Sequence, residues 1–235
     1  MMSVRNLFAA MFLTATVAAP ASAATYDIDP QNPKNVFQDA AGQNAWYVPV
    51  NRWMDNGEGG ANRQVAAGLF RVKEDLPGPI DRDFVAFCLS PNVWLNLNVD
   101  YSSGTGLSAA VKGALGALRM NAFDLVHDSL TAGAFQIAVW EIVADTGNLG
   151  VTDGSIRFTQ YGGQSPGAIS LAATWLGNIE NGTWQATTAG MRFHRAEGES
   201  QDLLEIAPVP LPAGGGLLIV ALAGLGVIAR RSRKA

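Results

Sequence analysis

The chain has 235 residues, of which 48% are hydrophobic, a formal net charge of −4 and a single cysteine. Residues 24–207 hold all 20 acidic residues and 11 of the 16 basic ones, so this segment carries a net charge of −9. Such acidity disfavours nucleic acid as a partner, because binding to the phosphate backbone requires a basic face. One cysteine excludes an internal disulfide, and with only two histidines we expect no metal site and no cofactor.

The first 23 residues predict an export signal. Arg5 precedes an apolar stretch from residue 7 to 19, and Ala21-Ser22-Ala23 is a small-residue cleavage site. The apolar stretch is too short to be a spanning helix. We therefore expect export through the secretion translocon and cleavage by signal peptidase after Ala23, which leaves residues 24–207 as one extracytoplasmic domain.

Two strands are predicted in the first half of this domain. Residues 64–73 alternate well enough near their end to indicate one strand, and residues 83–89 indicate a second. The alternation of the second strand places Cys88 on a buried face, close to the strand's end at Pro91. A thiol at a strand terminus can be reached from a neighbouring loop or helix.

Helices follow. Residues 107–119 predict one helix, and residues 129–145 predict another that is apolar on nearly every side and therefore buried all round. The remaining predicted elements are a strand at 155–160, a helix at 168–178 and strands at 191–196 and 201–207. Because strands bracket the helices, we expect an α+β fold: an antiparallel β-sandwich or barrel with an inserted small helical subdomain.

Two residues of this domain are chemically out of place. Cys88 is a lone thiol in an exported protein, and Gln136 lies in the apolar run of residues 134–140. A buried carboxamide without a hydrogen bond costs about 1–3 kcal/mol. Attack of the Cys88 sulfur on the Gln136 side-chain carbonyl, with loss of ammonia, would resolve both anomalies by forming an internal thioester. Water must then be excluded, and Phe87, Phe135 and Trp140 are the expected shielding residues.

The last 28 residues, 208–235, combine three features in a fixed order. Val209, Pro210, Leu211, Pro212 and Ala213 form a proline-containing motif. An uncharged apolar span at about 212–229 predicts a transmembrane helix, and a basic tail occupies 230–235. The basic tail places the C-terminus in the cytoplasm, so the rest of the chain lies outside the inner membrane.

This C-terminal segment resembles the VPLPA-CTERM variant of the PEP-CTERM sorting signal. The resemblance implies a Gram-negative protein that its C-terminal helix holds transiently in the inner membrane. An exosortase, a membrane cysteine protease, would then cut near the motif and direct the protein to the cell surface or extracellular matrix. A simple tail anchor is the alternative interpretation.

The cysteine and glutamine motifs also resemble a family. Phe87-Cys88-Leu89, followed by the run from Phe135 to Trp140, is similar to the paired motifs of the bacterial thioester domains, or TQXA domains, of Gram-positive adhesins. The resemblance implies that Cys88 and Gln136 are the bonded pair, and that the protein attaches once to an amine or hydroxyl of a surface protein or polysaccharide without being an enzyme. Phe135 stands where the family has threonine.

Two other interpretations remain open. Cys88 can be a small core residue and Gln136 a hydrogen-bonded helix residue, in a non-covalent matrix or glycan-binding protein. Five tryptophans are candidates for a glycan-stacking surface: Trp46, Trp53, Trp94, Trp175 and Trp184. Alternatively, Cys88 is a catalytic nucleophile with His127 or His194 as its base, although an apolar strand is a poor setting for a reactive thiolate.

Overall fold

The computed structural model describes residues 24–27, 46–55, 60–75, 82–96, 99–145, 147–184, 190–197 and 200–206. The predicted signal peptide (1–23) and the predicted sorting signal with its apolar span (208–235) lie outside these residues. Within the described ranges, no helix combines the length and hydropathy needed to cross a membrane.

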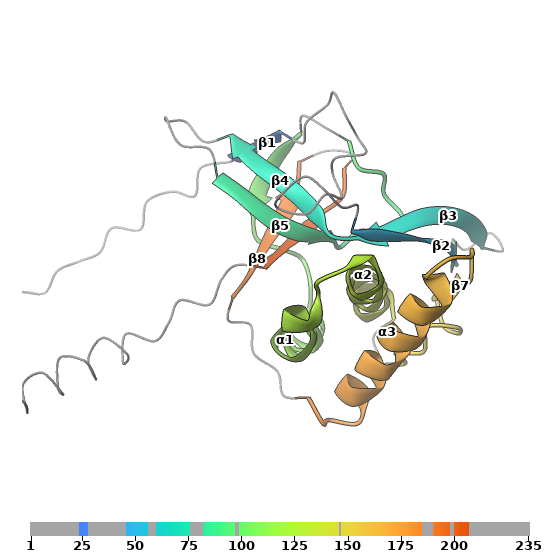
Figure 1. Ribbon diagram of the computed structural model, residues 1–235. Coiled ribbons are helices and arrows are strands. Elements are labelled where there is room, and N and C mark those ends of the chain that lie inside the picture. The colour runs from blue at the N-terminus through green and yellow to red at the C-terminus, as the bar shows by residue number, and fades with distance from the viewer. Residues whose placement is uncertain are drawn as a thin grey trace, which may run out of the picture.

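The strands form two antiparallel sheets (Figure 1). The larger sheet has the order β1 (Ala24–Asp27), β4 (Phe70–Asp75), β5 (Arg82–Cys88), β9 (Leu203–Ile206), β8 (Met191–Ala196) and β6 (Asp100–Ser103). β6 also pairs with β1 through two residue pairs, so the pairings return to their start. The smaller sheet has the order β3 (Ala61–Gly68), β2 (Tyr47–Met54) and β7 (Ile156–Thr159).

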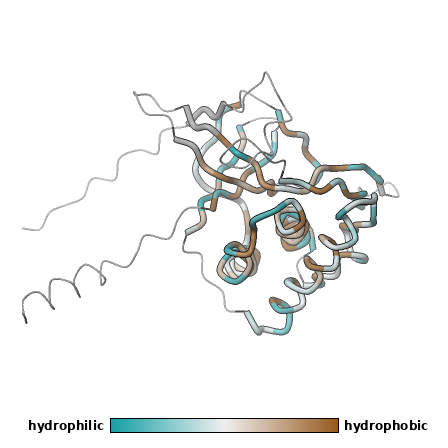
Figure 2. Tube along the Cα trace, in the orientation of Figure 1, coloured by the Kyte–Doolittle hydropathy of each residue, from teal (hydrophilic) through white to brown (hydrophobic). Residues whose placement is uncertain are grey.

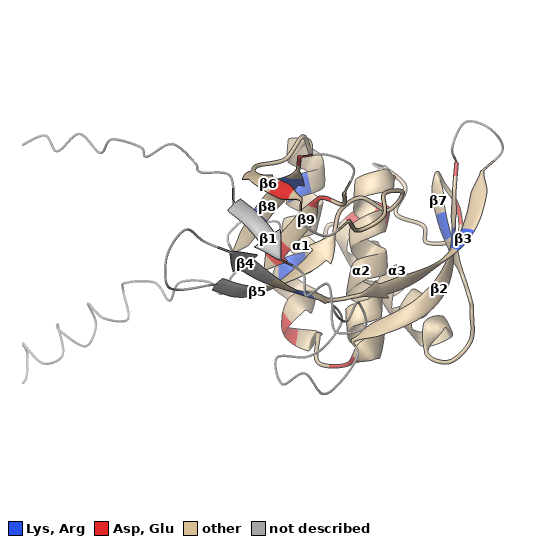
Figure 3. Ribbon diagram, turned by 90° about the horizontal axis from the view of Figure 1, so that it is seen from above, with Lys and Arg blue, Asp and Glu red and all other residues tan. Residues whose placement is uncertain are grey.

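Three helices come between β6 and β8 in the sequence: α1 (Ala109–Ala122), α2 (Ser129–Ala144) and α3 (Ser165–Glu180). A short 3-10 helix, Phe123–Leu125, follows α1. Helix α2 is central, since it contacts α1 and α3 as well as β2, β3, β5 and β7. Figure 2 shows hydrophobic residues on the strands and on the helix sides turned toward them, with α3 more hydrophilic along its outer turns. Figure 3 shows α2 and α3 almost entirely in the colour of uncharged residues.

Composition explains the position of α2. Asp128 caps its start by accepting the backbone N–H of Thr131 at 2.8 Å, and the Thr131 side chain completes a capping box. Every residue from Thr131 to Ile142 is buried. A helix that is apolar on all sides must be covered on all sides, which two sheets and two helices accomplish here.

The α+β class is confirmed, and the predicted helices and most predicted strands are present with shifted ends. The single strand predicted at residues 64–73 was wrong, because it is two strands, β3 and β4, that separate at Leu69. Gly68 pairs with Tyr47 in the small sheet, whereas Phe70 pairs with Ala86 in the large one. The chain therefore passes from one sheet to the other between them. Strands β1, β2 and β6 were not predicted.

Gly133 sets the close approach of α2 to β2. A Cβ atom added there would lie 2.8 Å from Val48 Cγ2, closer than two carbon atoms approach without strain. We expect Gly133→Ala to lower the free energy of unfolding by about 1–3 kcal/mol, because overpacking outweighs the better helix propensity of alanine. Urea denaturation of the purified protein measures the change.

Gly177 of α3 is the matched control, because a Cβ atom there would meet no heavy atom within 4 Å. Gly177→Ala should leave the protein as stable as the wild type or raise the free energy of unfolding by up to about 1 kcal/mol. Equal effects of the two substitutions would contradict the proposed close contact.

Candidate functional site

The candidate site begins where β5 loses one of its neighbours. Cys88 is the last residue of β5, and on the β4 side the pairing stops with Phe70 opposite Ala86. If β4 continued, Gly68 would stand opposite Cys88, but Gly68 belongs to the β3–β2 ladder. The N–H and C=O of Cys88 that point to this side therefore have no strand to bond.

The side chain of Gln136 takes the place of the missing strand. Its Oε1 accepts a hydrogen bond from the Cys88 backbone N–H at 2.8 Å, and its Nε2 donates one to the Cys88 carbonyl oxygen at 2.8 Å. Both residues are completely buried. A carboxamide carries the same donor and acceptor as a peptide group, so the Gln136 side chain extends the β-ladder by one step. The structure thus brings the two predicted residues into direct contact.

The thiol of Cys88 lies in an apolar setting. Burial raises the pKa of the Cys88 thiol to about 12, while a weak hydrogen bond to the Ser90 carbonyl oxygen at 3.4 Å acts in the opposite direction. At neutral pH the buried thiol is therefore almost entirely protonated. A free Cys88 would be slow to react with external reagents.

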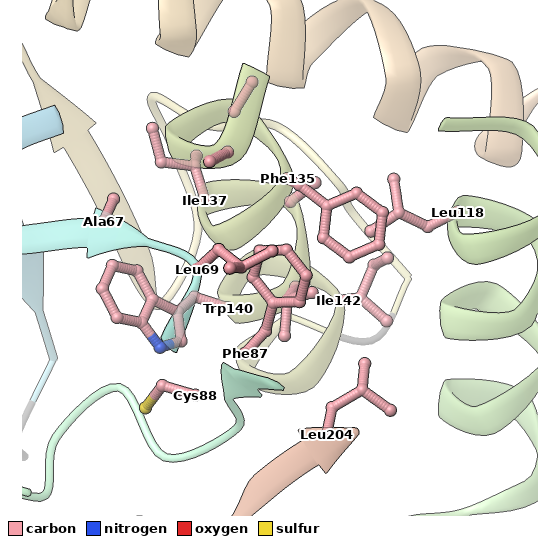
Figure 4. Packing of buried hydrophobic residues seen from close by; sticks show 14 of the residues in the cluster. Ala67, Leu69, Phe87, Cys88, Leu118, Phe135, Ile137, Trp140, Ile142 and Leu204 are labelled. Carbon is pink, nitrogen blue, oxygen red and sulfur yellow. The ribbon is translucent and has the colours of Figure 1, made fainter. Parts of the chain in front are cut away.

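Trp140 is the aromatic residue that faces the sulfur. Figure 4 shows its indole nitrogen directed toward the Cys88 side chain. This contact acts to lower the thiol pKa, but its geometry falls short of a hydrogen bond, and among the described residues the buried indole N–H has no partner. The Trp140 ring stacks on Phe158 of β7 at a centroid distance of 6.1 Å. The Trp140 ring is therefore held in place beside the thiol.

Phe87 and Phe135 lie behind the pair. Their ring centroids are 4.4 Å apart, and Phe135 also contacts the rings of Phe123 and Trp175 edge-on. The Phe87 ring points to the opposite face of β5 from the Cys88 sulfur (Figure 4). The rings of Phe87 and Phe135 therefore pack against each other in the interior between β5 and α2.

This arrangement can support attack of the thiol on the carboxamide. The Cys88 N–H polarises the Gln136 carbonyl and is placed to stabilise the oxyanion that attack would generate. The sulfur belongs to the residue that holds the carboxamide, so the two reacting groups are already close together. Complete burial of both residues keeps water away from a thioester once it has formed.

Neither histidine is bonded to the thiol. His127 is exposed, and the Nε2 atom of buried His194 is 2.8 Å from the Glu205 carboxylate. The thiol instead bonds to Ser90. Neither histidine predicted as a base for Cys88 is therefore placed next to its thiol.

The five tryptophans considered for glycan stacking have different environments. Trp175 is buried in the core, Trp53 lies under the Arg157 guanidinium at 4.3 Å, and Trp94 is 62% exposed. Trp46 and Trp184 are partly buried and pack against the core. Of these five, Trp94 presents the largest open ring.

Sequence reasoning missed Arg52, which lies close enough to Cys88 to influence its pKa. In β2 the inward positions are Val48, Val50 and Arg52, so the third apolar position holds a guanidinium. That alternation could have identified it, had β2 been predicted. The sorting motif, Val209 to Ala213, lies outside the described residues, and among those described no three His, Cys, Asp or Glu side chains gather as metal ligands do.

Comparison with known proteins gives one structural similarity. No protein-family model matches the sequence, and no curated protein matches it. Among solved structures, the chain is similar to the N-terminal thioester domain of fibronectin-binding protein SfbI from Streptococcus pyogenes, with 16% sequence identity. The match covers 74% of this chain and 98% of that one, with a TM-score of 0.39. At this identity and TM-score, the similarity does not assign the chain to a family.

Proposed function

We propose that Cys88 and Gln136 form an internal thioester through which this protein attaches covalently to an amine or hydroxyl nucleophile. The observation that carries the proposal is the pair of 2.8 Å hydrogen bonds between the Gln136 carboxamide and the Cys88 backbone, in a completely buried setting. Among the described residues, Gln136 is the one carboxamide that is hydrogen-bonded to Cys88.

The chemistry balances without a cofactor. A bond forms between Cys88 Sγ and Gln136 Cδ, the Cδ–Nε2 bond breaks, and the thiol proton leaves with Nε2 as ammonia. When a nucleophile later attacks Cδ, the carbon–sulfur bond breaks and the nucleophile's proton returns the sulfur to a thiol. The protein would act once, as a reactive adhesin or matrix cross-linker and not as a turnover enzyme.

The chain ends supply the cellular setting of the proposal. The segment 1–23 directs export, and the segment 208–235 holds the protein in the inner membrane until an exosortase processes it at the motif. The mature domain then reaches the cell surface or extracellular matrix. There it meets proteins and polysaccharides that carry amines and hydroxyls.

The test is the intact mass of the purified protein. We expect a species lighter than the calculated mass by one molecule of ammonia, and neither Cys88→Ala nor Gln136→Ala should show this loss. Methylamine should add to the lighter species and release one thiol that titrates after unfolding. A wild-type protein of full mass, with one thiol that titrates on unfolding before any treatment, would contradict the proposal.

That contrary result would favour the second candidate, a non-covalent matrix or glycan-binding protein. The same two hydrogen bonds support it, because they satisfy a buried glutamine without any covalent bond. The intact mass therefore separates the two functions in one measurement.

A further inference from the structure

A pocket of about 430 Å³ lies next to the candidate thioester site. Arg52 and Arg63 line it from β2 and β3, and Trp94 lines it from the segment that follows β5. Trp140 lines the same pocket, and Figure 4 shows its indole nitrogen directed toward Cys88, so the pocket and the Cys88–Gln136 pair have Trp140 as a common neighbour. A molecule in this pocket is one side chain away from the candidate thioester.

Arg52 indicates the charge of the ligand. The residue is only 6% exposed, its Nε atom has no hydrogen-bond partner, and no ion pair joins it to any described residue. Burial and the neighbouring charge of Arg63 both lower the pKa of Arg52, so its surroundings oppose the positive charge it carries. A buried, unpaired guanidinium is costly unless an anion meets it, and a carboxylate fits its planar fork.

The other polar groups of the pocket suit a hydroxyl-rich molecule. The Oε1 atom of Gln201, which lines the pocket, is buried and without a hydrogen-bond partner in the described part of the chain. At the rim, Gln64 and Asn92 are exposed amides. No acidic side chain lines the pocket among the residues described, so an ammonium ion would meet two guanidinium groups and no counter-charge.

Trp94 adds a flat apolar surface at the rim. It is 62% exposed, and the Arg63 guanidinium stacks on its ring at 5.6 Å. An open indole face beside amide groups matches the apolar face and hydroxyl edge of a sugar ring better than the flexible side chains of an acidic peptide.

We propose that this pocket binds a carboxylate-bearing sugar residue of an acidic polysaccharide, with the carboxylate on Arg52 and the ring against Trp94. A hydroxyl of this polysaccharide is then the nucleophile that takes the acyl group of Gln136. Its oxygen forms an ester with Cδ, the carbon–sulfur bond breaks, and the hydroxyl proton moves to the Cys88 sulfur. The transfer step rests on the proposed thioester, whereas the binding step does not.

The binding step is tested in the Cys88→Ala protein, in which no thioester can form. Trigalacturonate, neutral galactotriose and a tri-glutamate peptide are titrated separately by calorimetry. We expect trigalacturonate to bind most tightly, and Arg52→Gln to weaken that binding by about tenfold or more, as loss of one partner of a buried charge pair does. Arg195→Gln is the matched control, because Arg195 is exposed on β8 and does not line the pocket.

Trp94→Ala provides a second variant in case Arg52→Gln disturbs folding, since the exposed Trp94 ring adds little to the core. It should weaken binding of trigalacturonate as well. Equal affinities for the three probes, tighter binding of tri-glutamate, or unchanged affinity in both variants would overturn the proposed ligand.

The transfer step is tested with the wild-type protein and trigalacturonate, followed by intact mass. We expect an adduct that alkaline hydroxylamine removes, as it removes esters. If methylamine adds to the protein but trigalacturonate does not, the thioester stands and the proposed acceptor is wrong. If no ammonia is lost at all, the proposed function fails, and the calorimetry still decides whether the pocket binds the acidic sugar.

Discussion

In a Cys88→Ala background, Gln136→Leu should lower the free energy of unfolding by about 2–5 kcal/mol. The substitution conserves volume but leaves the N–H and C=O of residue 88 buried without partners, since the Gln136 side chain is what bonds them. Each unsatisfied buried group costs about 1–3 kcal/mol. Urea denaturation of the two proteins measures the difference.

The background removes a confounding effect. A thioester between residues 88 and 136 would cross-link the chain across 48 positions, and losing such a link would itself cost about 4 kcal/mol by the chain-entropy argument used for disulfides. With alanine at position 88 no cross-link exists in either protein. The measured difference then reports the two hydrogen bonds alone.

Gln164→Leu in the same background is the matched control. Gln164 is exposed before α3, and its side chain makes no capping hydrogen bond. Its replacement should change the free energy of unfolding by less than about 0.5 kcal/mol. If Gln136→Leu were as mild as this control, the carboxamide would not be completing the β-ladder of Cys88.

The sequence predicted what depends on local pattern. The apolar run of α2, its cap at Asp128 and the alternation around Cys88 each depend on neighbouring residues, and the structure has α2 and β5 close to their expected places. The lone thiol and the isolated glutamine could also be recognised as a pair from their chemistry and from the resemblance of their motifs.

What the sequence could not predict depends on long-range pairing. At the break the Leu69 N–H donates a hydrogen bond to the Trp46 carbonyl oxygen at 3.1 Å, a partner that lies outside residues 64–73. Because β4 does not continue beyond this break, the position beside Cys88 is occupied by the Gln136 side chain instead of a strand. Arg52 was overlooked because β2 was not predicted, although its position follows the alternation of buried residues in that strand. The position of the Cys88–Gln136 pair thus follows from a strand that changes sheets.

Glu141 should make stability fall as pH rises. It follows Trp140 on α2, is completely buried, and neither carboxyl oxygen has a hydrogen-bond partner among the described residues. Burial, with the nearby charges of Asp145 and Asp153, raises the pKa of Glu141 from 4.5 to about 9. The folded protein therefore keeps a proton at neutral pH that the unfolded chain releases.

Because the native state binds more protons than the unfolded state between the two pKa values, the stabilising effect is complete below 4.5 and is lost as pH rises toward 9. We expect the free energy of unfolding to fall by about 2–4 kcal/mol between pH 5 and pH 8.5, which is less than the full linkage value for this pKa shift. Glu141→Gln, a neutral replacement of the same shape, should remove this fall and stabilise the protein by about 1–3 kcal/mol at pH 8. Urea denaturation at pH 5, 7 and 8.5 measures both.

Glu180→Gln is the matched control, because Glu180 is exposed at the end of α3 and its replacement should keep the wild-type pH dependence. Parallel curves for the wild type and Glu141→Gln would show that Glu141 is charged in the folded protein, against the expectation.

A neutral Glu141 matters for the site as well. Glu141 is buried in the same helix as Gln136 and Trp140, and an ionised carboxylate there would favour entry of water into the interior around this helix. The proposed thioester should accordingly hydrolyse faster above pH 9 in the wild type than in Glu141→Gln, beyond the rise that hydroxide itself causes in both.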